Sequence, residues 1–240
     1  MDRLATALVT GANRGLGLEF ARQLLARGAH VVATARQPGR ATALNTLAAD
    51  HPGRLHVLPL DVGDPKSIDA LAAELALVLD RDGEPPGQLD LLLNNAGLLH
   101  SGERFGRLSA ANFDDSFRTN ALGPLLLAQA LAPRLADGGT IANVSSQLGS
   151  IGGCSRFGTP SYAVTKAAQN MATRQLASAL AGRGIVVLAL HPGWVRTDMG
   201  GEGADITPAE SVAGLLRVID GAGAEDSGRF LDWRGQPLAW

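Results

Sequence analysis

A tyrosine and a lysine in the second half of the chain have the residue types and the spacing of a proton-donating pair. Tyr162 and Lys166 are four residues apart in a stretch that predicts a helix, so their side chains project from one face. A free phenol has a pKa of roughly 10, and a nearby cation favours the phenolate. The pair is a candidate general acid, although a half-buried tyrosine beside a solvated lysine has the same spacing.

Short aliphatic runs alternate with helical stretches along the chain. The runs are continuous, as in strands covered on both faces, and fall at residues 4–10, 30–35, 55–60, 89–94, 140–145 and 185–191, with a last short strand at 229–231. Helices are predicted at 14–26, 40–49, 65–79, 112–136, 161–181 and 208–219. This order predicts an α/β Rossmann fold, a doubly wound parallel sheet of about seven strands with helices on both faces. Ligands of such sheets bind outside the carboxyl ends of the strands.

The composition indicates one compact domain that spans residues 1–240. The chain is 45% hydrophobic and 18% charged, which is typical of a globular protein with a single core. The two loops predicted at 80–88 and 200–207 are too short to link separate domains.

Charge and hydropathy exclude several classes of partner. A net charge of −2 gives no basic footprint for nucleic acid. No apolar run approaches the ~20 residues of a membrane-spanning helix, and the first residues do not resemble a signal peptide. The single cysteine, Cys154, has no internal partner, so we interpret it as a small loop or core thiol. We therefore expect a cytoplasmic protein with no membrane or nucleic-acid partner, and we assign no metal site.

A glycine-rich segment follows the first strand and opens the first helix. It reads Thr-Gly-Ala-Asn-Arg-Gly-Leu-Gly over residues 10–17. Glycine permits the tight turn and lets backbone amides approach a pyrophosphate, which the positive end of the helix attracts. Such a cluster alone is often only a turn, but its position between strand and helix favours a dinucleotide site made of Gly11, Asn13, Arg14, Gly15, Leu16 and Gly17.

The end of the second strand bears on which dinucleotide is bound. An NAD site typically places a carboxylate there for the ribose hydroxyls, whereas a 2′-phosphate needs positive charge. Here the strand ends in Thr34-Ala35-Arg36, without an acid. Arg14 and Arg36 are therefore interpreted as a clamp on that phosphate, which favours NADP(H) over NAD(H). The alternative is that both arginines are solvated surface residues.

Together these segments resemble a known family. The spacing Thr-Gly-x-x-x-Gly-x-Gly, the sequence Asn-Asn-Ala-Gly at 94–97, and a serine ahead of Tyr-x-x-x-Lys are similar to the short-chain dehydrogenases/reductases of ordinary length. The resemblance covers essentially the whole chain. Residues 191–201 and 228–233 look most like the carbonyl reductases of the Sniffer and C-factor group.

The resemblance implies catalytic roles. Tyr162 matches the general acid, and Lys166 matches the partner that lowers the phenol pKa and holds the nicotinamide ribose. Alignment of the strand and its following glycine places the carbonyl-polarising serine at Ser146, and Ser145 would point elsewhere because strand neighbours alternate. Asn120 matches the helix-interrupting asparagine that holds a water connecting Lys166 to solvent; otherwise it is a surface or helix-bend residue.

The resemblance also implies cofactor contacts. Asp61 and Val62 match the adenine contacts, and the segment with Asn94, Ala96 and Gly97 supports the sheet and lies along the adenosine ribose. Pro192 and Gly193 end the sixth strand, and Val195 and Thr197 match the residues that hold the carboxamide. His191 matches no base of the family and is interpreted as structural.

The implied activity is NADPH-dependent reduction of a small ketone or aldehyde. An apolar wall that contacts the substrate is predicted from Leu98, Leu99, Ile151, Phe157 and Trp194; the alternative is that these are core residues. A mobile lid is predicted at 199–207. The alternative is a dinucleotide-binding regulatory protein of the C-factor type with little turnover. The small residues Ala163, Ala167 and Ala168 allow a partner helix to approach closely, and the resemblance implies a homodimer, with a tetramer or a monomer as the alternatives.

Overall fold

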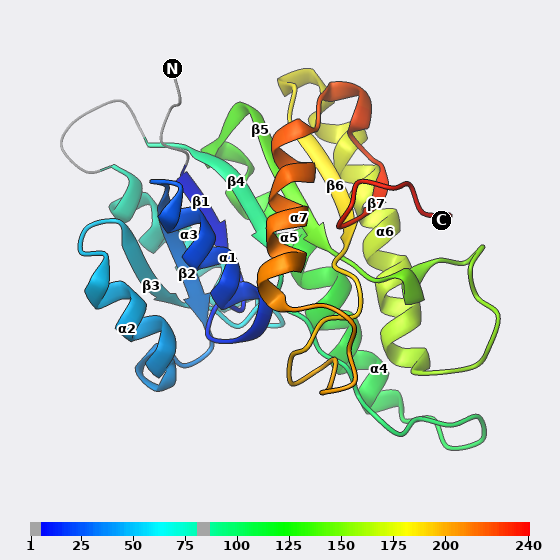
Figure 1. The fold of residues 1–240 in the computed structure, drawn as a ribbon. Helices are drawn as coiled ribbons and strands as arrows, with labels where there is room; N and C mark the ends of the chain where they lie inside the picture. The colour runs from blue at the N-terminus through cyan, green and yellow to red at the C-terminus, as the bar shows by residue number, and fades with distance from the viewer. Residues whose placement is uncertain (1–5, 81–86) are drawn as a thin grey trace.

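The computed structural model describes residues 6–80 and 87–240, which form one seven-stranded sheet (Figure 1). Its strands are β1 (Thr6–Val9), β2 (His30–Ala35), β3 (Leu55–Pro59), β4 (Leu89–Asn94), β5 (Leu135–Val144), β6 (Val186–His191) and β7 (Phe230–Asp232). They lie in the order β3-β2-β1-β4-β5-β6-β7, and every neighbouring pair is parallel. The predicted doubly wound sheet is confirmed.

Helices cover both faces of this sheet. The helices are α1 (Gly15–Ala26), α2 (Thr42–Asp50), α3 (Pro65–Leu79), α4 (Ala110–Phe117), α5 (Gly123–Leu131), α6 (Pro160–Leu180) and α7 (Pro208–Gly221). One apolar core lies between the sheet and α1, α2 and α7, and a second lies between the sheet and α3, α5 and α6 (Figure 1). Both faces of the central strands are therefore buried, which explains why the strands read as continuous aliphatic runs.

The strand order reverses between β1 and β4. Chain connections leave these two neighbouring strands in opposite directions, so a crevice opens at their carboxyl ends. In Figure 1 this edge is the lower one, where the turn from β1 into α1 lies. The sequence motifs at strand ends therefore meet there.

One predicted helix is wrong in its extent. The helix predicted at 112–136 is divided into α4, a π-helical turn at Arg118–Leu122, α5 and a 3-10 turn at Ala132–Arg134, and β5 already begins at Leu135. Pro133 in that 3-10 turn has no backbone N–H to continue the helix. β5 is longer than predicted because residues 135–139 also belong to it. Leu135 pairs with Leu89 of β4, and a register shift separates this pair from the pairing of Thr140 with Leu91. Most of the predicted loop at 80–88 lies outside the described residues.

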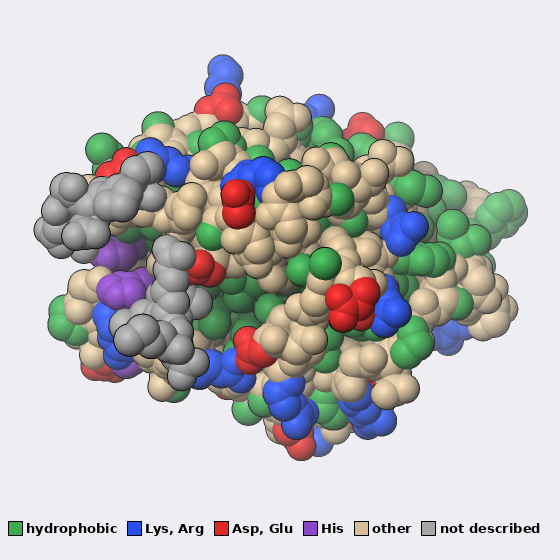
Figure 2. Space-filling model, turned by 90° about the horizontal axis from the view of Figure 1, so that it is seen from above, with side chains coloured by type: hydrophobic (Ala, Val, Ile, Leu, Met, Phe, Trp, Pro, Cys, Tyr) green, Lys and Arg blue, Asp and Glu red, His purple; other side chains and the backbone are tan. Residues whose placement is uncertain are grey.

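The face at the amino ends of the strands carries mixed charge. Figure 2, seen from above, shows Lys and Arg interspersed with Asp and Glu there. Hydrophobic side chains gather toward the right-hand end, where the loop through 151–159 projects in Figure 1. Among the described helices, none combines the length and apolar character that crossing a bilayer requires.

Candidate active site

The predicted proton-donating pair lies buried beside the end of β5. Tyr162 and Lys166 are 8% and 2% exposed, and the Lys166 Nζ lies 5.6 Å from the centre of the Tyr162 ring. The Tyr162 hydroxyl is hydrogen-bonded to Ser146, which lies two residues past the end of β5. Lys166 Nζ donates to the Val144 carbonyl at 2.7 Å and to Gln169 Oε1 at 2.9 Å. The interpretation of this tyrosine as half-buried beside a solvated lysine is therefore wrong.

Burial dominates the protonation of both groups. It raises the pKa of Tyr162 to about 12, and the hydrogen bond from Ser146 acts in the lowering direction. Burial also lowers the pKa of Lys166 to about 7. The sequence predicts a phenol pKa lowered by Lys166, and the structure differs because desolvation penalises both charged forms. Tyr162 is consequently protonated at neutral pH.

The structure separates the two candidate serines. Ser145 Oγ donates to Asn170 Oδ1 at 2.6 Å inside the protein, whereas Ser146 faces Tyr162. Gly149, just beyond, packs directly on α6, and a Cβ there would lie 2.8 Å from the Lys166 Cβ. This close approach holds the segment after β5 against the helix that carries Tyr162 and Lys166.

Asn120 interrupts the helix as the resemblance implies. It lies fully buried in the π-helical turn Arg118–Leu122, a kind of turn frequently found at functional sites. Its Oδ1 accepts from the Leu98 amide and its Nδ2 donates to the Leu98 carbonyl, both at 2.8 Å, and Nδ2 also donates to Thr165. Asn120 therefore ties the segment after β4 to α6. Its role in holding a water stays a prediction.

The glycine turn is built for close approach of a ligand to the backbone. Gly11 and Gly15 have φ of +63° and +55°, which glycine adopts without strain. A Cβ at Gly17 would overlap the Gly11 carbonyl and lie 2.6 Å from Asn95 Nδ2. The N-cap residue of α1, Arg14, makes no side-chain capping bond, so first-turn amides stay available to an anion. A side chain at Gly11 or Gly17 would therefore collide with the backbone that packs around this turn.

Two residues that the sequence reasoning missed hold this turn in place. Thr10 Oγ1 accepts from the backbone amides of Asn95 and Ala96, each at 3.0 Å. Asn95 Nδ2 donates to the carbonyls of Thr10 and Gly11 at 2.9 and 3.3 Å. Thr10 follows β1 and Asn95 follows β4, and a polar residue at such a strand end is the sequence feature that indicates this role. They lock the β1 turn to the end of β4.

A chain of close contacts connects the glycine turn with the catalytic pair. A Cβ at Gly11 would lie 3.0 Å from the Ala96 Cα, and one at Gly97 would lie 3.5 Å from Asn120 Oδ1 and 3.8 Å from Lys166 Nζ. The structure therefore brings together, at one edge of the sheet, motifs that are far apart in the sequence.

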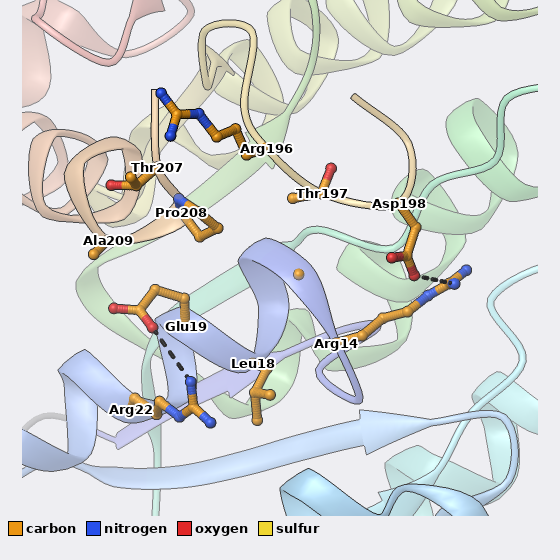
Figure 3. A pocket seen from close by; sticks show the side chains of 11 residues that line it. Arg14, Leu18, Glu19, Arg22, Arg196, Thr197, Asp198, Thr207, Pro208 and Ala209 are labelled. Atoms are coloured by element: carbon orange, nitrogen blue, oxygen red, sulfur yellow. Dashed lines mark hydrogen bonds and ion pairs between the residues drawn. The ribbon is translucent and has the colours of Figure 1, made fainter. Parts of the chain in front are cut away.

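The two predicted phosphate-binding arginines differ in their surroundings. Arg36 is exposed just beyond β2, without an ion pair among residues 6–80 and 87–240. Arg14 reaches across to Asp198 at 2.6 Å, and both side chains are exposed (Figure 3). Asp61 is exposed, its Oδ1 accepts from the Gly63 amide at 2.9 Å, and Val62 is buried next to it. Only Nη1 of Arg14 is bonded to Asp198, and the clamp on the 2′-phosphate stays a prediction.

A cavity of about 440 Å³ opens between the start of α1 and the segment before α7 (Figure 3). Its walls are Arg14, Gly15, Leu18, Glu19, Arg22, Arg196, Thr197, Asp198, Thr207, Pro208 and Ala209. Gly15 and Thr197 face each other there, since a Cβ on Gly15 would lie 3.5 Å from Thr197 Cγ2. The cavity adjoins the glycine turn, and the predicted cofactor residues Arg14, Gly15 and Thr197 lie in its wall, so its use by the dinucleotide is a prediction.

The segment after β6 forms a loop closed at its base. Val195 pairs with Ile206, and the Arg196 amide donates to the Ile206 carbonyl at 2.9 Å. Gly193 has a φ of +83°, and a Cβ there would lie 2.6 Å from Ile206 Cδ1. Pro192 accepts through its carbonyl from Ser211 at 2.6 Å, which ties β6 to α7. The predicted lid at 199–207 belongs to this loop, and its motion stays a prediction.

Three other sequence candidates have environments that the structure now defines. Asn94 is buried, and its Nδ2 donates to Asn143 Oδ1 at 2.8 Å across the sheet, so its cofactor contact stays a prediction. Burial lowers the pKa of His191 to about 4, with Asp232 acting in the raising direction, which agrees with a structural role. Cys154 is exposed, so it is a loop thiol.

Part of the predicted apolar wall lies at the surface. Ile151, Phe157 and Trp194 are 78%, 54% and 52% exposed, so the alternative that they are core residues is wrong. Leu98 and Leu99 are only partly buried. Phe157 makes an edge-to-face contact with Phe105, their ring centres 5.7 Å apart. The loops after β4 and β5 therefore meet beside the catalytic helix.

The fold and this arrangement of side chains define a class of protein. The family model of the short chain dehydrogenases matches residues 5–205, so the chain belongs to that family. The narrower resemblance is also confirmed. The NADPH-bound carbonyl reductase from chicken fatty liver superposes with a TM-score of 0.92 at 41% identity, over 99% of this chain and 100% of that one. The carbonyl reductase Sniffer of D. melanogaster superposes with a TM-score of 0.92 at 33% identity, with the same two coverages.

Curated relatives differ in what their names state. The C-signal of Myxococcus xanthus is 42% identical over 156 residues, which are 64% of this chain and 94% of that protein. A 1-hydroxy-2-glutathionyl-2-methyl-3-butene dehydrogenase of Rhodococcus sp. (strain AD45) is 35% identical over 99% of this chain and 100% of its own length. This chain is thus similar both to a named enzyme and to a protein named as a signal.

Proposed function

We propose that the protein is an NADPH-dependent reductase of a small ketone or aldehyde. The observation that carries the proposal is the buried hydrogen bond between Ser146 and Tyr162, with Lys166 behind the phenol and the glycine turn at the same sheet edge. A module that only bound a dinucleotide would have no need of a buried, protonated phenol next to a second hydroxyl.

NADP(H) is the proposed cofactor. The glycine cradle, the uncapped start of α1 and the exposed Arg36 fit a dinucleotide with a 2′-phosphate. The solved relatives from chicken fatty liver and from Burkholderia multivorans are described as bound to NADPH and to NADP. When bound, NADPH supplies a hydride to the carbonyl carbon of the substrate.

Contacts to the cofactor are proposed for residues around this crevice. Gly11, Asn13, Gly15, Leu16 and Gly17 would hold the pyrophosphate, and Arg14 and Arg36 the 2′-phosphate. Further contacts, to the adenosine and nicotinamide halves, are proposed for Asp61, Val62, Asn94, Ala96, Gly97, Tyr162, Lys166, Pro192, Gly193, Val195 and Thr197.

The catalytic residues act on the carbonyl oxygen. Ser146 and Tyr162 donate hydrogen bonds to it, and Tyr162 transfers its phenolic proton as negative charge develops on that oxygen. Each preorganised donor of this kind typically increases the reaction rate by a factor of ~10²–10³. A positioned general acid increases it by a factor of about 10²–10⁴. Lys166, when charged, stabilises the phenolate left behind. Asn120 holds the segment after β4 beside Lys166. We propose that a proton returns to Tyr162 through this region by way of Lys166.

The proposed substrate class is supported by the surface beside this site. Ile151, Phe157 and Trp194 present exposed apolar side chains on loops near the ends of β5 and β6. Such walls suit an aliphatic or aromatic carbonyl compound better than a sugar.

The test is NADPH oxidation measured by absorbance against a panel of ketones, aldehydes and quinones. Wild type is compared with Tyr162→Phe, which keeps the ring and removes the proton. We expect kcat to fall by at least about 10²-fold, because general acid catalysis is lost, while the Kd for NADPH stays within about twofold. A variant as active as wild type would exclude Tyr162 as the acid.

A regulatory protein is the second candidate, favoured by the similarity to the C-signal. Tight NADPH binding without turnover of any carbonyl in the panel would support it against the reductase.

A homodimer is also proposed. Its support is two exposed apolar side chains on α6, Val164 and Met171, which are 54% and 61% exposed. They lie near the small residues Ala163, Ala167 and Ala168 in the sequence.

A further inference from the structure

The catalytic helix begins without a cap of its own. Helices α3, α4 and α7 are each capped by their N-cap side chain, from Asp64, Ser109 and Thr207 respectively. At the start of α6 the N-cap residue, Thr159, makes no side-chain capping bond. Its backbone is left-handed, with φ of 41°, the only positive φ outside glycine among the described residues. Such a conformation is strained for a β-branched residue and is kept by its surroundings.

A carboxylate from a distant segment supplies the missing cap. Glu103 Oε2 accepts from the Ser161 backbone amide at 3.1 Å and from the Ser161 hydroxyl at 2.8 Å. Ser161 is the second residue of α6, and its amide is one that an N-cap side chain normally satisfies. The carboxylate also lies at the positive end of the helix, where a negative charge is favourable. Glu103 thus replaces an N-cap across 58 residues of sequence.

The bonds also join the substrate side of the site to the proton donor. Glu103 lies in the segment between β4 and α4, which passes near the start of α6 (Figure 1). Tyr162 directly follows Ser161, so the first turn of α6 sets where the phenol points. Buried Ser116 of α4 lies 3.4 Å from Ser161, hydroxyl to hydroxyl, which extends the contact to a third element.

We propose that Glu103 is a positioning residue for Tyr162. By capping α6 from the neighbouring loop, Glu103 holds the first turn closed and keeps the phenol buried against Ser146. The contribution to turnover rests on the proposed reductase function, whereas the effect on the environment of Tyr162 does not.

The single tyrosine of the chain permits a direct test that needs no substrate. Because Tyr162 is the only tyrosine, phenolate absorbance during a pH titration reports this residue alone. In wild type we expect a midpoint near the raised pKa of about 12. In Glu103→Ala the first turn frays and admits water, so the midpoint falls toward the ordinary value of roughly 10. Glu103→Gln keeps an oxygen acceptor for Ser161 and stays near wild type.

The same variants are compared in turnover. We expect Glu103→Ala to lower kcat about tenfold with the KM for NADPH within about twofold, and Glu103→Gln to restore at least half of the wild-type kcat. Glu74→Ala, an exposed glutamate of α3, is the matched control and should equal wild type in both experiments. If Glu103→Ala fails to fold, Ser161→Ala removes one of the two bonds and should shift the titration midpoint in the same direction.

Three outcomes would overturn the proposal. An unchanged titration midpoint in Glu103→Ala excludes a positioning role, whether or not the wild type turns over any substrate. A midpoint that falls as far in Glu103→Gln as in Glu103→Ala shows that charge acts and the cap does not. An equal loss in Glu74→Ala shows a general effect of removing surface charge. Lack of turnover in wild type with a shifted midpoint in Glu103→Ala contradicts only the reductase function.

Discussion

The two halves of the crevice are built by opposite means. On the β1–α1 side the structure depends on absent side chains, because Gly11 and Gly17 leave no room for a Cβ. On the β5–α6 side it depends on polar side chains that are present and buried, among them Ser145, Ser146, Lys166, Gln169 and Asn170. A dinucleotide is held by backbone and shape, whereas a proton is moved by side chains in a low-dielectric environment.

Several buried polar groups on the catalytic side bond to one another, although Gln169 Nε2 and Asn94 Oδ1 have no hydrogen-bond partner among the described residues. Asn143 connects Asn94 of β4 to Thr173 of α6 through bonds of 2.8 and 2.9 Å. Lys166 and Asn170 are likewise bonded to the segment of residues 144–149. An unpaired polar group there would cost its full desolvation penalty. We therefore expect cofactor binding on the β1–α1 side to be sensitive to added side-chain atoms. On the β5–α6 side, we expect activity and stability to be sensitive to added atoms and also to changes of charge.

The largest effect is expected from Gly17→Ala, on the β1–α1 side of the crevice. The added Cβ meets the Gly11 carbonyl and lies 2.6 Å from Asn95 Nδ2, so the turn must open. We expect the Kd for NADPH to rise at least about tenfold, because backbone amides no longer converge on the phosphates. Fluorescence titration with NADPH measures it. Gly182→Ala, where a Cβ meets nothing within 4 Å, is the control, and equal affinities in the two variants would contradict the interpretation.

The same substitution on the other side, Gly149→Ala, completes this prediction. Its Cβ would lie 2.7 Å from the Lys166 carbonyl carbon, which displaces Ser146 from Tyr162. We expect kcat to fall about tenfold while the Kd for NADPH changes less than about threefold, because the glycine turn is untouched. A loss of affinity as large as that of Gly17→Ala would remove the distinction between the halves.

Lys166→Met tests charge on the catalytic side through stability. Burial lowers the pKa of Lys166 from its ordinary 10.5 to about 7, so between these values the unfolded chain binds more protons than the folded one. Stability relative to the methionine variant should therefore rise with pH from about 7 to 10 and be flat below 7. Urea unfolding across this range measures the difference, and a constant difference would show that Lys166 is not desolvated.

Arg36→Ala is expected to have the smallest effect. The exposed guanidinium beyond β2 is proposed to bind only the 2′-phosphate, so the Kd for NADPH should rise about threefold, as expected for an exposed ion pair, and the Kd for NADH stay unchanged. Titrations with both nucleotides measure it. Arg217→Ala, an exposed arginine of α7, serves as the control. An equal loss for NADH would reassign Arg36 to a part that both cofactors share.

Local patterns predicted most of the elements. The strands at 30–35 and 89–94 and the helix at 65–79 have the predicted bounds, because hydrophobic period and flanking breakers are properties of a few neighbouring residues. The helix predicted at 112–136 failed for the opposite reason. Its apolar period continues into β5, and only pairing with β4 and β6 decides that residues from Leu135 onward are a strand.

The sequence by itself determined the glycine turn, the Tyr162 and Lys166 pair and the alternation that places them at strand ends, since these depend on fixed spacings along the chain. Only the tertiary structure decided the contacts between distant segments, such as Thr10 and Asn95 around the turn and Glu103 on the catalytic helix. It also decided the direction of the pKa shifts of Tyr162 and Lys166. The reason is that desolvation depends on what surrounds a side chain in space, which its neighbours in sequence do not specify.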